Sequence, residues 1–354
     1  MSRFLSAKYK KLVPYTPGEQ PKDMQYVKLN TNESPFPPSL KAQEMAEKAS
    51  KKLQLYSDPE CKILREKLAE TFGVKETQVI ATNGSDEILN FAFMAYCDEN
   101  TPAAFADITY GFYPVFADVN NLPYELIPLK EDFSIDATDY FNLGKTIFIA
   151  NPNAPTGMAL SKNQIAEILK NNPDNIVVID EAYVDFGAES AVELVGEFDN
   201  LLVTQTFSKS RSMAGARLGF GIASEAIIAD LNTIRYSTNP YNVNSMTLAA
   251  GYGVLCDEQY TKDNCKKIAE NREWFVSELK KLGYETLPSL ANFVFAKNER
   301  LGGRETYLKL KEKGILVRQF EKERISQYIR ITIGTKEQLS ALLSALKEIL
   351  EETK

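Results

Sequence analysis

The chain has 354 residues, 44% of them hydrophobic and 25% charged, which is enough for one large or two medium globular domains. Its formal net charge is −7 and it has no long basic tract, so we expect no nucleic-acid partner, although local arginines can still bind small anions. The chain contains no histidine, which removes the commonest general base and the commonest metal ligand from its chemistry.

The cysteines and the N-terminus indicate a reducing compartment. The cysteines are scattered without C-x-x-C spacing, and no histidine can complete a zinc site, so we expect free thiols and no metal. They are Cys61, Cys97, Cys256 and Cys265. Residues 1–15 lack the continuous apolar core of a signal peptide, and no apolar run is long enough to span a bilayer. A cytoplasmic protein without a membrane partner is expected.

Residues 1–40 are expected to be irregular, because six prolines interrupt them. Apolar strands and helices then alternate up to about residue 243. The expected strands are 78–82, 103–107, 145–150, 176–180, 201–204 and 218–223, and the expected helices between them include 87–96 and 161–171. Because these strands are continuously apolar rather than alternating, they indicate a mostly parallel sheet that is covered on both faces.

The pattern changes after residue 243. Two long helices are expected first, followed by short strands, a helix and a closing helix, which is typical of a smaller α+β unit. The helices are 244–255, 260–282, 304–313 and 336–351, and the strands are 291–296, 315–318 and 328–333. We therefore predict an α/β protein with an N-terminal arm or small-domain segment (1–40), a large domain (41–255) and a small C-terminal domain (256–354).

One lysine follows a predicted strand and has a hydroxyl beside it. Lys209 comes directly after Ser208, and Arg217 follows eight residues later. A lysine in this setting can hold an aldehyde cofactor as a Schiff base while its neighbours bind the cofactor's phosphate.

Other polar residues also fall at strand ends, where ligands bind in open α/β sheets. Gly84, Ser85 and Asp86 open a helix, either as a plain N-cap or as a phosphate site. Asp180 ends a strongly apolar strand, either as a structural cap or as the partner of a pyridinium nitrogen, and Tyr183 lies three residues on.

The loop 151–157 and the C-terminal strand leave two further questions open. The proline-rich loop is either a bare turn or a support that places Asn153 in a site. Arg330 lies within an apolar strand and needs an anion, which is either an internal carboxylate or a carboxylate or phosphate of the substrate. Arg318 ends a neighbouring predicted strand, so the two guanidinium groups can converge.

Four segments together carry a resemblance to a known family. They are NPNAPTG (151–157), DEAYVDF (180–186), TFSKSRSMAGARLGF (206–220) and YIRITIGT (328–335). In this order and spacing the chain resembles the fold-type-I pyridoxal-phosphate aminotransferases from Tyr15 to Thr335. LNTNESPFPPS (29–39) and LYSDPE (55–60) are similar to the histidinol-phosphate aminotransferase subfamily, but also to threonine-phosphate decarboxylase and to aromatic aminotransferases.

The resemblance implies a fold-type-I homodimer that binds pyridoxal 5'-phosphate in its large domain and acts on small amino and keto substrates. Lys209 would be the catalytic amine, with Asp180 at the ring nitrogen and Tyr183 at the phenolic oxygen. The other implied cofactor contacts are the stacking ring of Tyr110, Asn153 in the loop, the phosphate-binding Gly84, Ser85, Asp86, Ser208 and Arg217, and Tyr56 from the neighbouring subunit. The implied substrate contacts are Tyr15, Asn32, Arg318 and Arg330.

One departure from the family pattern concerns Ala154, which stands where an asparagine is usual. That asparagine would donate to the cofactor's phenolic oxygen, so its absence would favour the protonated form of the bound cofactor. Asn153 can compensate if it turns inward.

The sequence predicts transamination between histidinol phosphate and 2-oxoglutarate. The alternatives are an aromatic amino acid aminotransferase, a threonine-phosphate decarboxylase on the same scaffold, and a cofactor-binding sensor protein. A sensor normally carries a DNA-binding module, for which this chain has no spare basic helical segment.

Overall fold

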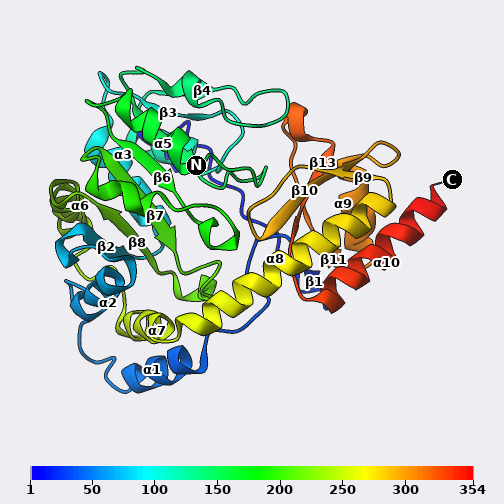
Figure 1. The fold of residues 1–354 in the computed structure, drawn as a ribbon, viewed down its shortest axis with the longest axis horizontal. Coiled ribbons are helices and arrows are strands. Elements are labelled where there is room, and N and C mark those ends of the chain that lie inside the picture. Colours follow the sequence, from blue (N-terminus) through cyan, green and yellow to red (C-terminus); the bar gives the residue numbers. More distant parts are fainter. Residues whose placement is uncertain (1, 354) are drawn as a thin grey trace.

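The computed structural model describes residues 2–353, and its largest element is a sheet of seven strands in the order β2-β8-β7-β6-β5-β3-β4 (Figure 1). The strands are β2 (Val79–Thr82), β3 (Ala103–Ala106), β4 (Tyr124–Ile127), β5 (Thr146–Ala150), β6 (Val177–Asp180), β7 (Leu201–Thr206) and β8 (Gly219–Ala223). Strand β8 runs antiparallel to both of its neighbours, and all other pairs are parallel. The predicted mostly parallel sheet is therefore confirmed.

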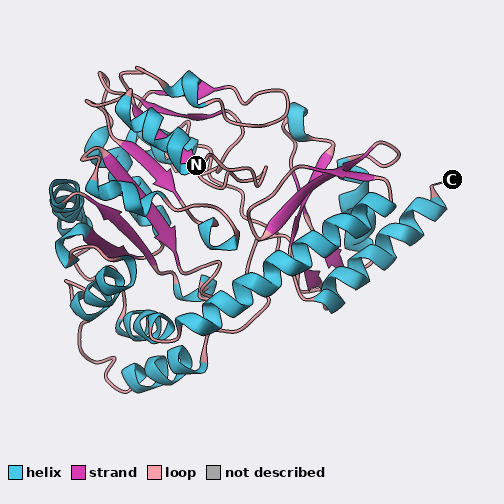
Figure 2. Cartoon of the chain, viewed as in Figure 1, coloured by secondary structure: helices cyan, strands magenta, loops and turns pink. Residues whose placement is uncertain are grey.

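Helices cover both faces of this sheet, as Figure 2 shows. The helices of this part of the chain are α1 (Leu40–Ser50), α2 (Lys62–Phe72), α3 (Ser85–Tyr96), α4 (Tyr113–Asn120), α5 (Lys162–Lys170), α6 (Glu225–Thr238) and α7 (Ser245–Leu255), of which α1 packs against α7. Along β6, Val177 and Ile179 pack into one apolar core and Val178 into the core on the other face. Because each face is buried, both sets of positions in the strand are apolar.

A second, antiparallel sheet has four strands in the order β12-β13-β10-β9 and lies to the right of the large sheet in Figure 1. Its strands are β9 (Tyr284–Thr286), β10 (Phe293–Asn298), β12 (Arg318–Gln319) and β13 (Tyr328–Thr332). The accompanying helices are α8 (Glu258–Lys281), α9 (Gly303–Glu312) and α10 (Lys336–Glu352). No helix within residues 2–353 is both long and apolar enough to cross a membrane.

The expectation of one strand over 315–318 was wrong, because the segment serves two sheets. Strand β11 (Ile315–Leu316) pairs in parallel with β1 (Val27–Lys28), whereas β12 pairs with β13. The N-terminal segment, expected to be irregular, thus contributes a short strand beside the smaller sheet. The division of the chain at residues 40 and 255 remains a prediction.

Candidate active site

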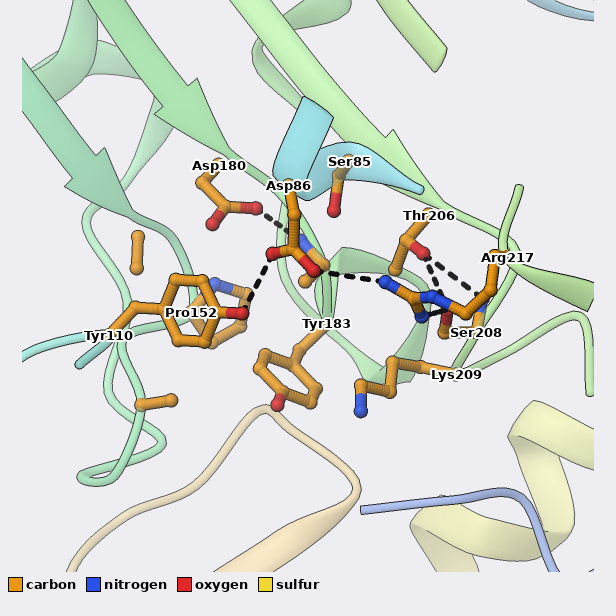
Figure 3. A pocket seen from close by; sticks show the side chains of 13 residues that line it. Ser85, Asp86, Tyr110, Pro152, Asp180, Tyr183, Thr206, Ser208, Lys209 and Arg217 are labelled. Carbon is orange, nitrogen blue, oxygen red and sulfur yellow. Dashed lines mark hydrogen bonds and ion pairs between the residues drawn. The ribbon is translucent and has the colours of Figure 1, made fainter. Parts of the chain in front are cut away.

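The ends of the central strands surround a cavity of about 110 Å³ in the large sheet (Figure 3). Eight of the eleven residues predicted to contact the cofactor line it. The full lining is Ser85, Asp86, Tyr110, Ala150, Pro152, Ala154, Asp180, Ala182, Tyr183, Thr206, Ser208, Lys209 and Arg217. The carboxyl ends of β5, β6 and β7 therefore bring together side chains that are far apart in the sequence.

The Lys209 amine reaches this cavity from the turn that follows β7. Its Nζ donates to the backbone oxygen of Thr31 at 3.2 Å and lies 5.8 Å from the centre of the Tyr183 ring. No carboxylate within residues 2–353 comes within 4.0 Å of this amine. An amine without an acidic partner is available to react with a carbonyl or to carry a proton.

Asp180 is a buried carboxylate with no cationic partner in the part of the chain that the structure describes. It accepts hydrogen bonds from the Tyr113 hydroxyl at 3.1 Å, from the Ala182 amide at 3.3 Å and from the Thr204 hydroxyl at 3.5 Å. Burial raises the pKa of Asp180 to about 6. A carboxylate in this state favours a positively charged group in the cavity beside it.

Tyr113 was missed in the sequence analysis. It is fully buried at the start of α4 and reaches Asp180 from three residues beyond Tyr110. The available signal was the aromatic cluster at 110–113, in which a buried tyrosine must find a hydrogen-bond partner.

One end of the cavity is formed by the first turn of α3 and by Arg217. Arg217 Nη2 donates to Asp86 at 2.9 Å, Arg217 Nη1 donates to Ser208 Oγ at 3.3 Å, and the Tyr110 hydroxyl donates to Asp86 at 2.7 Å. A helix N-terminus beside an arginine and hydroxyl groups is suited to an anion.

Two glycines make this close approach possible. Gly84 has φ +82°, and a Cβ on Gly219 would lie 2.2 Å from the backbone nitrogen of Ser85. A side chain at Gly219 would therefore push β8 away from the start of α3. Gly84 itself does not line the cavity but sets the direction in which Ser85 enters the helix.

Asn153 lies behind the cavity wall rather than in its lining. Its Nδ2 donates to the Ile108 carbonyl at 2.9 Å and to Thr156 Oγ1 at 3.2 Å, and its Oδ1 accepts from the Thr109 hydroxyl at 2.7 Å. With its amide used in this way, Asn153 holds the loop in place and does not turn inward to replace the amide missing at Ala154.

A larger cavity of about 490 Å³ opens beside the first and shares Tyr110, Ala154, Tyr183 and Lys209 with it. All four residues predicted to contact the substrate line this second cavity: Tyr15, Asn32, Arg318 and Arg330. The structure thus brings the predicted substrate residues next to the predicted cofactor residues.

The two arginines of this cavity have different surroundings. Arg330 donates to the Asn30 carbonyl at 3.1 Å, its Nε has no partner, and burial lowers its pKa. Arg318 donates to the carbonyls of Thr16 and Pro17 at 3.1 and 3.3 Å. Within residues 2–353 neither guanidinium has a carboxylate within 4.0 Å, so the structure supplies no internal counter-ion for Arg330.

Tyr56 lies away from both cavities and is 83% exposed. Its ring stacks on Tyr241 at a centroid distance of 4.6 Å. Tyr56 is therefore not among the described residues that line either cavity.

The chain is similar in sequence to known proteins. A family model described as "Aminotransferase class I and II" matches residues 24–346. The chain is 48% identical over 353 residues to a histidinol-phosphate aminotransferase of Brachyspira hyodysenteriae and 49% identical over 353 residues to one of Marinomonas sp.. Both matches cover 99% of this chain and 100% of the relative.

Solved structures share the fold at lower sequence identity. A histidinol-phosphate aminotransferase from Sinorhizobium meliloti in complex with pyridoxal-5'-phosphate has a TM-score of 0.87 and 22% identity, covering 93% of this chain and 92% of that chain. An L-threonine-O-3-phosphate decarboxylase from Porphyromonas gingivalis has a TM-score of 0.80 and 22% identity, covering 92% of this chain and 99% of that chain. At this identity the structures establish the architecture alone, so the choice between these two activities comes from the closer sequence relatives.

Proposed function

The chain belongs to the class I and II aminotransferase family, and we propose that it transfers the amino group of histidinol phosphate to 2-oxoglutarate, with pyridoxal 5'-phosphate as cofactor. The observation that carries this proposal is the Lys209 amine, which has no carboxylate partner among the described residues and shares a cavity with the buried Asp180. The substrate is supported by relatives named for it, which match this chain over their whole length.

The residues around the cavity fit the cofactor at each end. Asp180 is buried without a cation and would hold the ring nitrogen in its protonated form. Tyr183 would donate to the phenolic oxygen, and the ring of Tyr110 would stack on the pyridine face. At the other end, Arg217 and the hydroxyls of Ser85 and Ser208 would bind the phosphate.

When bound, pyridoxal 5'-phosphate supplies an electron sink for the electron pair left on the substrate's α-carbon. Lys209 would remove the α-proton and return it, because its amine faces both cavities. The Thr31 carbonyl, 3.2 Å away, accepts a hydrogen bond from that amine and orients it.

The anionic ends of the substrates would lie in the larger cavity. Arg330 has donors to spare and no internal carboxylate, and Arg318 stands at the same cavity, so both can bind a carboxylate or a phosphate. Tyr15 would form part of the wall of this cavity, since its ring packs on that of Phe112 with 4.4 Å between the ring centroids.

A homodimer is part of the same proposal. The segment from α1 to α2 exposes several large apolar side chains, as expected of a surface that another protein covers. They are Leu40 (75% exposed), Leu53 (54%), Leu55 (64%), Tyr56 (83%) and Ile63 (65%). A second copy of the chain covering this segment would bring Tyr56 to the partner's site. We also place the protein in the cytoplasm, in keeping with four free cysteines.

The test is an assay of the purified, cofactor-loaded protein with 2-oxoglutarate and one amino donor at a time. Histidinol phosphate should give glutamate faster than tyrosine or phenylalanine, and phosphothreonine should release no CO₂. Lys209→Ala should reduce turnover by roughly a thousandfold or more. Lys75→Ala is the matched control, because Lys75 is exposed and pairs with Glu225 on the surface. Turnover of Lys209→Ala at the parental rate, or preferred decarboxylation, would rule the proposal out.

A further inference from the structure

Asn32 is held by hydrogen bonds at every polar group it has. Its backbone N–H donates to Thr332 Oγ1 at 2.9 Å, and its backbone carbonyl accepts from Asn292 Nδ2 at 3.0 Å. Its side-chain Oδ1 accepts from the Thr332 hydroxyl at 3.0 Å, and its Nδ2 donates to the Tyr183 hydroxyl oxygen at 3.0 Å. The residue is buried and has φ +57°, a conformation that asparagine adopts more readily than most residues.

The Thr332 hydroxyl makes two of these hydrogen bonds. Its oxygen accepts from the Asn32 backbone N–H, and its hydrogen is donated to Asn32 Oδ1. The amide oxygen of Asn32 therefore faces Thr332, and the amide NH₂ faces Tyr183. Because the Tyr183 oxygen accepts a hydrogen bond from this NH₂, the Tyr183 hydroxyl does not donate its own hydrogen to Asn32.

The Tyr183 hydroxyl has no second hydrogen-bond partner within residues 2–353. Tyr183 lines both cavities, and Figure 3 shows its hydroxyl and the Lys209 amine extending in the same direction. A phenolic hydrogen that is excluded from Asn32 is left to point into this shared space.

Ala154 makes the orientation of that hydrogen more important. It lines the same cavity, packs against Tyr183 and Phe293, and has no polar side-chain atom. The neighbouring Asn153 uses its amide on Ile108 and Thr156. On the part of the wall formed by Ala154, Ala182 and Tyr183, the Tyr183 hydroxyl is the only side-chain donor among the described residues.

We propose that Asn32 is a positioning residue, anchored by Thr332, that aims the Tyr183 hydrogen into the cavity and so maintains the one donor left to the cofactor's phenolic oxygen. The inference rests on the cofactor assigned above. Thr332 belongs to β13 of the smaller sheet, whereas Tyr183 follows β6 of the larger one. Through Thr332 and Asn32, the smaller sheet thereby sets the direction of the Tyr183 hydroxyl hydrogen, at a site built mainly by the larger sheet.

The test uses the visible absorbance of the bound cofactor, titrated with pH, as a readout that is independent of turnover. A donor at the phenolic oxygen stabilises its deprotonated, charged form, so loss of the donor raises the pKa of the chromophore. Asn32→Asp keeps the shape of the side chain but replaces the NH₂ with an oxygen, so Tyr183 would donate to it instead. We expect Asn32→Asp and Thr332→Val each to raise the chromophore pKa by about one unit, and Thr332→Ser to keep the parental value.

Repeating the substitutions in a Tyr183→Phe background separates this role from other effects. The added charge of Asn32→Asp acts on the chromophore in both backgrounds, whereas the change in hydrogen direction needs the hydroxyl. The remaining charged groups around the cavities are the same in every variant: Asp86, Asp107, Asp180, Lys209, Arg217, Arg318, Lys322 and Arg330. We expect Thr332→Val to shift the chromophore pKa in the parent but not in Tyr183→Phe.

Equal shifts in both backgrounds, or no shift of Thr332→Val in the parent, would overturn the proposal. Thermal unfolding of the cofactor-free variants serves as the folding control. If Thr332→Val does not fold, the test is whether Asn32→Asp shifts the chromophore pKa more in the parent than in the Tyr183→Phe background. The proposed function fails separately, if the parent protein shows no cofactor absorbance or no turnover of histidinol phosphate.

Discussion

The Tyr113 hydroxyl donates a 3.1 Å hydrogen bond to Asp180 Oδ2, and both side chains are buried. Burial raises the pKa of Tyr113 well above 10, so this group remains a donor at any ordinary pH. The bond holds the carboxylate in one orientation at the end of β6, although burial still raises its pKa to about 6. Asp180 is therefore preorganised for a cation, and no lysine or arginine among residues 2–353 pairs with it.

This pairing predicts a pH dependence of stability in the cofactor-free protein. Between about pH 4 and 6 the folded state holds the Asp180 proton more tightly than the unfolded state, so the free energy of unfolding falls as pH rises. Asp180→Asn removes this contribution, worth up to about 3 kcal/mol. Thermal unfolding between pH 4 and 8 should show Asp180→Asn gaining stability relative to the parent as pH increases.

Glu181→Gln is the matched control for that experiment. Burial raises the pKa of Glu181 to about 7. Its carboxylate accepts hydrogen bonds from Ser190, Ala191 and Gln205 and does not line the cavity. Loading the cofactor should weaken the pH dependence due to Asp180 and leave that due to Glu181. Identical slopes for Asp180→Asn and its parent would contradict the prediction.

A second prediction concerns Ala154→Asn. An amide at this position adds a donor beside Tyr183, which would stabilise the charged phenolic oxygen and lower the chromophore pKa by about one unit. The measurement is an absorbance titration of the loaded protein. Ala154→Leu has a similar size without an amide, so it controls for crowding against Phe293. An unchanged pKa in Ala154→Asn would show that the added amide does not reach the cofactor.

A third prediction tests whether Tyr56 acts across a dimer interface. Subunits carrying Tyr56→Ala and subunits carrying Lys209→Ala are each expected to be impaired alone. In a mixed dimer, one site would combine an intact Lys209 with the partner's intact Tyr56. Dimers purified through two different tags should regain about half of the parental activity.

Ultracentrifugation provides the control for this experiment, by verifying that both variants still dimerise. If the mixed dimers are no more active than the single variants, then Tyr56 acts within its own subunit or not at all.

A fourth prediction concerns Arg330, which has an unpartnered Nε and no internal carboxylate among the described residues. Arg330→Gln should lower kcat/KM about a hundredfold, because a charge-assisted, bidentate contact with the substrate is lost. Arg330→Lys should restore little of it, since an ammonium cannot reproduce the planar fork. Steady-state kinetics with histidinol phosphate and with glutamate show for which of the two substrates kcat/KM depends on Arg330.

The control for Arg330 is Arg304→Gln, since Arg304 is exposed and pairs only with Glu321. A change of less than threefold in Arg330→Gln for both substrates would exclude Arg330 from anion binding.

Local sequence determined the elements and the reactive groups of this protein. Continuous apolar runs specify strands buried on both faces, and polar residues directly after those runs must lie at the carboxyl edge of the sheet. This is why Lys209, Asp180 and Ser85 could be predicted to meet. Both features are local, since they depend only on the pattern of apolar residues along a strand and on the residue at which the strand ends. Arg217 precedes β8 and joins these three residues because that strand runs antiparallel to its neighbours.

Tertiary structure decided which partner each polar group takes. The Asn32–Tyr183 and Asn32–Thr332 contacts join residues 151 and 300 positions apart, and the direction of the Asn153 amide depends on a carbonyl 45 positions away. The pairing of β1 with β11 is similarly non-local. No local pattern encodes such contacts, because side-chain hydrogen bonds depend on how the two sheets pack, and packing depends on the whole chain at once.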